Sequence, residues 1–282
     1  MCVFYDILQI DIKIKVILYN TMEISLNASP KLDTFACLFQ HIKLFGEKIN
    51  VMFGPEKMYI QGMDNSHISI FEIYLPNTWF DQYTTSDIGV TIGINGHFLF
   101  KVLSTRERGQ NMRLYLDSED CDQLLIDFTS SETNVYDKHF QIPLMEIDSE
   151  TMHIPTMDYQ AEFSLASTTF SVLIEQMRMF ADDLNLFCSE DMIQMGSSSE
   201  HTGKMIVDIP IDDLNTFSIN EGQEIKASFS LAQMHNICLY NKIAKDVEIS
   251  LMDQFPIRLV YSLGQEDAKL IFYLAPKINE NE

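Results

Sequence analysis

Residues 272–278 read Phe272-Tyr273-Leu274-Ala275-Pro276-Lys277-Ile278, and the chain continues as Asn279-Glu280-Asn281-Glu282. The first stretch is apolar until a proline closes it in a turn, and the second is an acidic tail. An exposed apolar run directly before charged residues has no evident role in a hydrophobic core. We therefore expect this segment to meet a partner.

A second stretch, residues 61–69, reads Gln61-Gly62-Met63-Asp64-Asn65-Ser66-His67-Ile68-Ser69. Together and in this order, the two stretches resemble segments of the proliferating cell nuclear antigen (PCNA) family of DNA polymerase sliding clamps. The resemblance extends over most of residues 22–282 and indicates a divergent member. It implies two similar α+β domains of the DNA-clamp fold, with antiparallel sheets outside and helices inside. Three such chains would close into a ring of pseudo-sixfold symmetry.

The composition is typical of a soluble intracellular protein. With 282 residues, 46% of them hydrophobic, the chain has enough apolar material for one large domain or two ordinary ones, and two is the better expectation. The five cysteines form no C-x-x-C pair, which argues against a disulfide framework or a zinc site and favours a reducing compartment. No apolar stretch reaches the roughly 18 residues of a membrane span, so we expect no membrane partner.

The chain is strongly acidic, with a formal net charge of −22. Phosphate binding normally requires a basic surface, so this charge argues at first against nucleic acid as a partner. Two interpretations stay open. The charge keeps an abundant protein soluble, or the few basic residues gather on one concave face and hold DNA only where the protein encloses it.

An internal repeat is visible without any family. Residues 23–29 (Glu-Ile-Ser-Leu-Asn-Ala-Ser) return as residues 162–168 (Glu-Phe-Ser-Leu-Ala-Ser-Thr), and each runs from an alternating strand into an amphipathic helix. We expect Ser29 to cap the first helix and Pro30 to occupy its first turn. The expected apolar helix faces are Leu32, Phe35, Phe39 and Ile42 in the first repeat and Phe170, Leu173, Met177 and Phe180 in the second.

Each repeat continues with a strand pair, a second helix and further alternating strands. The second helices are expected over 96–105 and 231–242. This pattern predicts two α+β domains, each with two helices on antiparallel sheet. The expected boundaries are an unassigned extension 1–21, an N-terminal domain 22–142, a connector 143–157 and a C-terminal domain 158–282.

In the clamp family, a front-face groove beneath the interdomain connector binds a short peptide motif of polymerases, ligases and nucleases. The resemblance carries this groove onto apolar and aromatic residues, as a helical-turn peptide ligand requires. It implies a groove of Met63, His67, Ile68, Ile70, Met152, Ile154, Pro256, Tyr273, Ala275 and Pro276. For Met63 and Ile70 taken alone, ordinary core packing is the open alternative.

The resemblance also implies a channel, lined by helices, that holds duplex DNA. The candidate channel residues are Lys31, Lys101, Arg106, Arg178, Lys242 and Lys245. Lys101 matches a channel lysine of the family fairly well, whereas Glu175 stands where the family carries a basic residue. We therefore expect a weakly basic channel that contacts phosphates without reading sequence, and a solvated helix face is the alternative for each single lysine.

Ring closure in the family comes from antiparallel pairing of edge strands, which correspond here to 135–142 and 201–209. Both segments alternate as edge strands do. The expected interface residues are Tyr136, Phe140 and Ile142 on one side and Met205, Val207 and Ile209 on the other. Because unpaired edges of this kind promote aggregation, we predict a homotrimer.

An enzyme is the main alternative from another class, and the sequence argues against it. Ser66 and His67 are adjacent on an expected strand and point to opposite faces, so with Asp64 they cannot form a nucleophile–base pair. The sequence contains no nucleophile elbow, phosphate-binding loop, zinc-protease or dinucleotide motif, so we predict no catalysis, cofactor or metal. A subunit of a hetero-oligomeric checkpoint clamp remains the nearer alternative, although Leu274–Ile278 favours the replicative clamp.

The family further implies the partners and the location. The expected partners are double-stranded DNA, a DNA polymerase, a clamp loader and other proteins with the peptide motif, including repair enzymes. The expected location is the nucleus. The unmatched residues 1–21 and the divergence suggest a viral or protist source as a hypothesis, and a viral replication site would then replace the nucleus.

Overall fold

The computed structural model describes residues 22–116, 122–146, 151–265 and 267–277, and the expected extension 1–21 lies outside them. The described residues form two compact units. The first contains residues 22–62 and 73–146, and the second contains residues 63–72 and 151–277. The segment around His67 therefore packs with the second unit, although it lies within the range 22–142 expected for the first domain.

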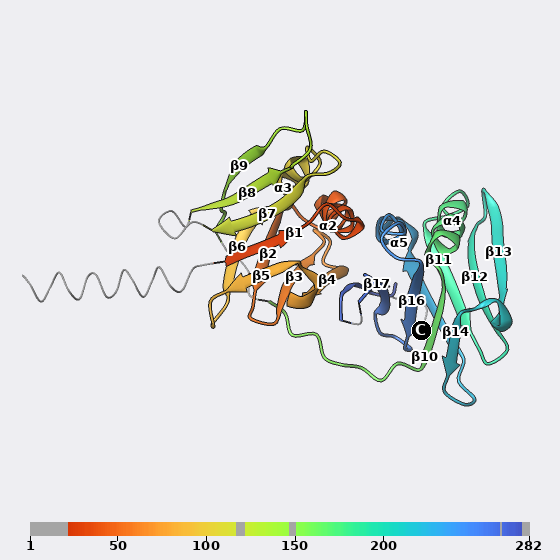
Figure 1. The fold of residues 1–282 in the computed structure, drawn as a ribbon. Coiled ribbons are helices and arrows are strands. Elements are labelled where there is room, and N and C mark those ends of the chain that lie inside the picture. Colours follow the sequence, from red (N-terminus) through yellow and green to blue (C-terminus); the bar gives the residue numbers. More distant parts are fainter. Residues whose placement is uncertain (1–21, 117–121, 147–150, 266, 278–282) are drawn as a thin grey trace, which may run out of the picture. The chain divides into compact units, whose positions relative to one another are not determined.

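The first unit contains two antiparallel sheets and two helices, labelled as in Figure 1. One sheet has the order β5-β1-β7-β8-β9, and the other has the order β4-β3-β2-β6, with β4 contributing from Ile73 onward. The elements are β1 (Met22–Leu26), α2 (Pro30–Gln40), η1 (Ile42–Leu44), β2 (Lys48–Phe53), β3 (Lys57–Met63), β4 (Ser69–Pro76), η2 (Asn77–Trp79), β5 (Gln82–Thr85), β6 (Val90–Asn95), α3 (Gly96–Leu103), β7 (Asn111–Leu116), β8 (Gln123–Thr129) and β9 (Lys138–Pro143).

Helix α2 begins at Pro30 as expected, because its fixed φ suits the first helical turn. The expected side-chain cap is wrong, since the Ser29 side chain makes no capping hydrogen bond. The second helix, α3, does have a side-chain cap, because Asn95 Oδ1 accepts from the Phe98 amide at 2.8 Å. The expected apolar face of α2 is buried, and Phe35 packs edge-on against Phe39 with ring centroids 5.2 Å apart.

The second unit has the same plan. One sheet has the order β14-β10-β16-β17-β18, with Ser69–Glu72 of β4 beside β18, and the other has the order β13-β12-β11-β15. The elements are β10 (Ala161–Ala166), α4 (Ser167–Met177), β11 (Asp183–Cys188), β12 (Met192–Ser199), β13 (Gly203–Pro210), η3 (Ile211–Asp213), β14 (Thr216–Ile219), β15 (Ile225–Ser230), α5 (Leu231–Cys238), β16 (Asp246–Leu251), β17 (Ile257–Ser262) and β18 (Lys269–Leu274).

The buried face of α4 differs from the expected one. Phe170, Ile174 and Met177 are fully buried, whereas Leu173 is only partly buried. Phe180 follows the end of the helix at Met177. Phe170 and Met177 are confirmed, whereas Leu173 is wrong, because the neighbouring Ile174 is also apolar and tertiary packing buries it instead.

The two units repeat each other element by element. Strands β1 to β9 correspond in order to β10 to β18, α2 and α3 correspond to α4 and α5, and both sheets follow the same strand order in each unit. This confirms the duplication and the α+β clamp-type domains expected from the sequence. It also identifies β9 and β13 as strands paired on one side only, with β8 and β12 respectively.

Candidate functional site

The loop that follows β3 is organised by one buried carboxylate. Asp64 is 3% exposed, and its Oδ1 accepts from the amides of Ile68 at 2.9 Å and Ser69 at 2.7 Å. Its Oδ2 accepts from the Ser66 amide at 3.2 Å and from Gln233 Nε2 at 3.4 Å. These bonds close a tight turn in which His67 takes a φ of 57°. Both carboxylate oxygens of Asp64 are thus engaged in holding the turn.

The C-terminal segment lies against this loop within the second unit. The Ala275 amide donates to the Ile68 carbonyl at 2.9 Å, and the Lys277 amide donates to the Ser228 carbonyl at 2.7 Å. Main-chain hydrogen bonds therefore fix the segment on both sides of Pro276. The structure thus brings together the two stretches that decided the sequence analysis.

The expected groove residues are partly or fully exposed on this unit. His67, Ile68 and Met152 are exposed, and the last two keep 38% and 40% of their surface. The remaining seven are partly buried: Met63, Ile70, Ile154, Pro256, Tyr273, Ala275 and Pro276. None of the ten is a fully buried core residue.

Two groups beneath this surface were missed by the sequence analysis. Glu72 on β4 is only 4% exposed, and its Oε2 accepts from the Tyr273 hydroxyl at 3.2 Å. Burial, helped by the nearby Glu72 charge, raises the pKa of Tyr273, so the phenol stays protonated and donates. The neighbouring strand carries Arg258 within an otherwise apolar run, and that interruption was a signal available from the sequence.

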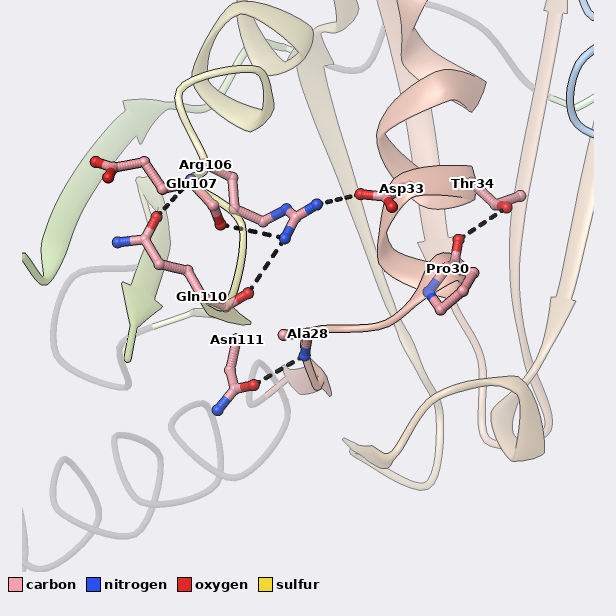
Figure 2. A network of polar contacts seen from close by, with 8 residues as sticks. All are labelled: Ala28, Pro30, Asp33, Thr34, Arg106, Glu107, Gln110 and Asn111. Atoms are coloured by element: carbon pink, nitrogen blue, oxygen red, sulfur yellow. Dashed lines mark hydrogen bonds and ion pairs between the residues drawn. The ribbon is translucent and has the colours of Figure 1, made fainter. Parts of the chain in front are cut away.

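The candidate channel cations of the first unit are largely engaged. Arg106 forms an ion pair with Asp33 of α2 and donates to the carbonyls of Glu107 at 3.3 Å and Gln110 at 3.4 Å (Figure 2). Lys31 Nζ donates to the Trp79 carbonyl at 3.1 Å. Lys101, by contrast, is exposed on α3.

A cleft of about 780 Å³ beside the start of α2 contains the Arg106 pair. Its other charged residues are Arg108 and Glu132, so two arginines face two carboxylates. Since the charges balance, this cleft offers no particular attraction for a phosphate.

The second unit shows the same compensation. Glu175 Oε2 lies 3.1 Å from an Arg178 nitrogen and 3.0 Å from Nε2 of His235 on α5. Burial lowers the pKa of His235, with Arg178 acting in the same direction and Glu175 against it. Lys242 and Lys245, exposed after α5, take part in none of the ion pairs within the described part of the chain.

The six expected interface residues divide by exposure. Tyr136 is 75% exposed but precedes β9, and Phe140 packs edge-on against Phe128 at 5.8 Å. Ile142 and Ile209 are buried at 2% and 9% exposure, so their side chains serve their own unit. Met205 and Val207 are partly buried. The exposed apolar residue of β13 is Ile206, at 50%, which the expected alternation had placed on the wrong face.

Metal centres and membrane-spanning helices are two other classes of feature that the described residues could form. Within residues 22–116, 122–146, 151–265 and 267–277, histidine, cysteine and acidic side chains form no group of three or more that could hold a metal ion. In the same ranges, no helix is both long and apolar enough to cross a membrane.

Family models match almost the whole chain. The model described as the proliferating cell nuclear antigen N-terminal domain matches residues 20–151, and the model described as the C-terminal domain matches residues 153–278. The boundary between the two matches falls inside the expected connector 143–157.

Individual relatives agree with the family models. The chain is 29% identical to proliferating cell nuclear antigen of Chaetomium thermophilum over 79% of its own length and 86% of that protein. It is 24% identical to the DNA polymerase sliding clamp of Methanobrevibacter smithii over 86% and 94% of the two chains. The crystal structure of proliferating cellular nuclear antigen from Entamoeba histolytica superposes with a TM-score of 0.78 at 22% identity, covering 91% of this chain and 99% of that one.

Proposed function

This chain belongs to the proliferating cell nuclear antigen family, as a divergent member, and from that premise we propose how it works as a DNA polymerase sliding clamp. The named relatives support a role in DNA replication, and they do not favour the hetero-oligomeric checkpoint alternative.

The observation that carries the proposal is the internal symmetry of the strands. Within the second unit, β18 lies beside Ser69–Glu72 of β4. In the repeat, the strand that corresponds to β18 is β9, and the strand that corresponds to β4 is β13. Among the residues that the structure describes, neither of these two strands is paired on its outer side. We infer that β9 of one chain pairs with β13 of the next, which closes three chains into a ring of six equivalent junctions.

A closed ring needs little affinity for DNA, because enclosure prevents its loss from the duplex. The weakly basic helix surfaces suit this arrangement, with Lys101, Lys242 and Lys245 as contacts to phosphates. Such contacts carry no sequence information, so the ring slides. The net charge of −22 then repels DNA from the remaining surface.

Partner enzymes are held at the surface that His67, Ile68, Tyr273 and Pro276 share. We propose that this surface takes a helical turn with apolar and aromatic side chains, supplied by a polymerase, a clamp loader or a repair enzyme. Tethering raises the effective concentration of the enzyme at DNA and leaves the chemistry to the enzyme, so the chain itself acts as a scaffold. We place this activity in the nucleus, since the named relatives give no support to a viral replication site.

The solution mass of the full chain tests the ring. Light scattering after gel filtration should give three chain masses, about 97 kDa from the 32.5 kDa chain, across the micromolar range. Ile206→Lys places a charge beside the free edge of β13 and should shift the mass toward one chain. Ile88→Lys adds the same charge at a side chain that is 71% exposed in the loop before β6, and it should leave the trimer intact. A wild-type monomer throughout would exclude the homotrimer.

A further inference from the structure

A row of polar side chains crosses the second unit from β10 to β4. Glu162 is the register partner of Ser250, Ser250 that of Arg258, and Arg258 that of Tyr273. The Tyr273 hydroxyl then reaches Glu72. Neighbouring strands lie about 4.8 Å apart, and each acid is two strands away from Arg258, so the backbone of Arg258 lies roughly 10 Å from that of either acid.

Both acids of the row are engaged by hydroxyl groups. Glu162 Oε1 accepts from Ser250 Oγ at 3.0 Å, and Glu72 Oε2 accepts from the Tyr273 hydroxyl at 3.2 Å. Neither acid forms an ion pair with Arg258. Across the described part of the chain, Arg258 has no carboxylate within ion-pair distance, and its guanidinium carbon lies 5.9 Å from the centre of the Tyr159 ring. The central cation of the row is thus left without an anion.

The pKa shifts of two tyrosines, Tyr159 and Tyr273, show that the Arg258 charge acts on both. Burial raises the pKa of both Tyr159 and Tyr273, and in both cases the Arg258 charge opposes the rise. Arg258 therefore lies close enough to both phenols for its charge to act on them. The nearby acids act in the opposite direction, since Glu162 raises the pKa of Tyr159 and Glu72 raises that of Tyr273.

We propose that Arg258 binds an acidic side chain of the partner peptide and so selects partners that combine an apolar or aromatic anchor with an aspartate or glutamate. The proposal rests on the partner surface of the proposed function. Tyr273, an expected groove residue, is the register partner of Arg258, and the groove residue Pro256 lies two positions earlier, directly before β17.

The chemistry of arginine suits this selection. Its planar guanidinium binds a carboxylate through two parallel hydrogen bonds, and the half-buried position beside two rings reduces competition from water. A strongly acidic chain would otherwise repel acidic peptides. Arg258, as a cation without an ion-pair partner beside the groove residues, would attract an acidic side chain at this one place.

Binding of labelled synthetic peptides to the full chain tests the proposal. Each peptide carries one helical turn with an apolar and an aromatic anchor, and each member of the set has a single glutamine replaced by glutamate at a different position around the anchor. At one position, glutamate should tighten binding to the wild-type chain about tenfold, as a charge-assisted pair implies. Arg258→Gln should remove this preference while keeping the affinity for the all-glutamine peptide. Arg258→Lys should keep part of it.

Lys226→Gln is the matched control, because it removes one exposed positive charge from β15 of the same unit and should leave the preference unchanged. Equal binding of all peptides by the wild-type chain would overturn the proposal, and so would a preference that survives Arg258→Gln. Equal weakening of every peptide by Arg258→Gln would make Arg258 a structural residue and would overturn the proposal as well. If the wild-type chain binds no peptide, the partner surface of the proposed function fails as well.

Discussion

Gly93 lies directly against the main chain of Met145. The Met145 amide donates to the Gly93 carbonyl at 2.8 Å, and a Cβ at residue 93 would stand 2.5 Å from the Met145 carbonyl oxygen. Strand β6 ends its sheet, so Met145 covers a free edge at the start of the connector. Only glycine permits this approach, because the opposing atom belongs to the main chain and cannot rotate away.

Gly93→Ala should therefore release the start of the connector. The change pushes the Met145 carbonyl away and breaks a main-chain hydrogen bond, so we expect a loss of about 1–2 kcal/mol of unfolding free energy in urea. Hydrogen exchange at the Met145 amide should accelerate in parallel. Gly54→Ala is the control, since its added Cβ would meet the nearest atom at 3.4 Å, an ordinary contact. An unchanged exchange rate at Met145 would contradict the proposed close approach.

Asp64→Asn tests whether one carboxylate shapes the loop that carries His67 and Ile68. An amide keeps a single acceptor atom, so its NH₂ group would face either the Ser66 amide or the pair from Ile68 and Ser69. We expect a loss of about 1–3 kcal/mol of stability, because a buried donor is left unsatisfied. Peptide affinity should fall with it.

Asp253→Asn is the matched control for that change. Asp253 is an exposed acid in the loop before β17, and removing its charge should leave both stability and peptide binding unaltered. If Asp64→Asn lowered stability but left peptide affinity intact, the loop would be a structural turn without a role in partner binding.

Much of this molecule was predictable from sequence because its information is local or repeated. The repeat of 23–29 at 162–168 predicted two matching domains. The apolar run that begins at Phe272 was expected to be exposed, which is wrong for Phe272 and Leu274, because these alternate side chains of β18 are fully buried in the core. Side-chain burial on α4 was less predictable, since Leu173 and Ile174 fit the helical period equally well. On β13 the expected outer residue Ile209 is buried, and the exposed Ile206 lies on the other face of the strand.

Polar groups that act through tertiary contacts were harder to foresee. Nothing in the residues near Asp33 indicates that Arg106, 73 positions later, neutralises it. Nothing in the residues near Glu72 indicates that it is buried and accepts a hydrogen bond from Tyr273, 201 positions later. Residues that pair across the fold can be assigned roles only once the strand order is known, and strand order depends on the whole chain.

His235→Gln should reduce the dependence of stability on pH. The unfolded chain binds a proton at this histidine below about pH 6.5, whereas burial holds the folded pKa lower. Its contribution is therefore complete above pH 6.5 and is lost as the pH falls toward the folded pKa. Urea unfolding at pH 7.5 and 5.5 should show a smaller decrease for His235→Gln than for the wild type. His201→Gln, in an exposed turn, should behave as the wild type does.

Asp33→Asn should make the ring hold DNA more tightly. The substitution frees Arg106 from its ion pair, so a guanidinium now balanced by α2 becomes available to phosphate. Each new phosphate contact should steepen the plot of log affinity against log salt by about 0.9. Asp87→Asn removes an equal charge from an exposed loop of the same unit and should change the affinity far less. If the two variants shift the salt dependence equally, net charge and not the Asp33–Arg106 pair limits DNA contact.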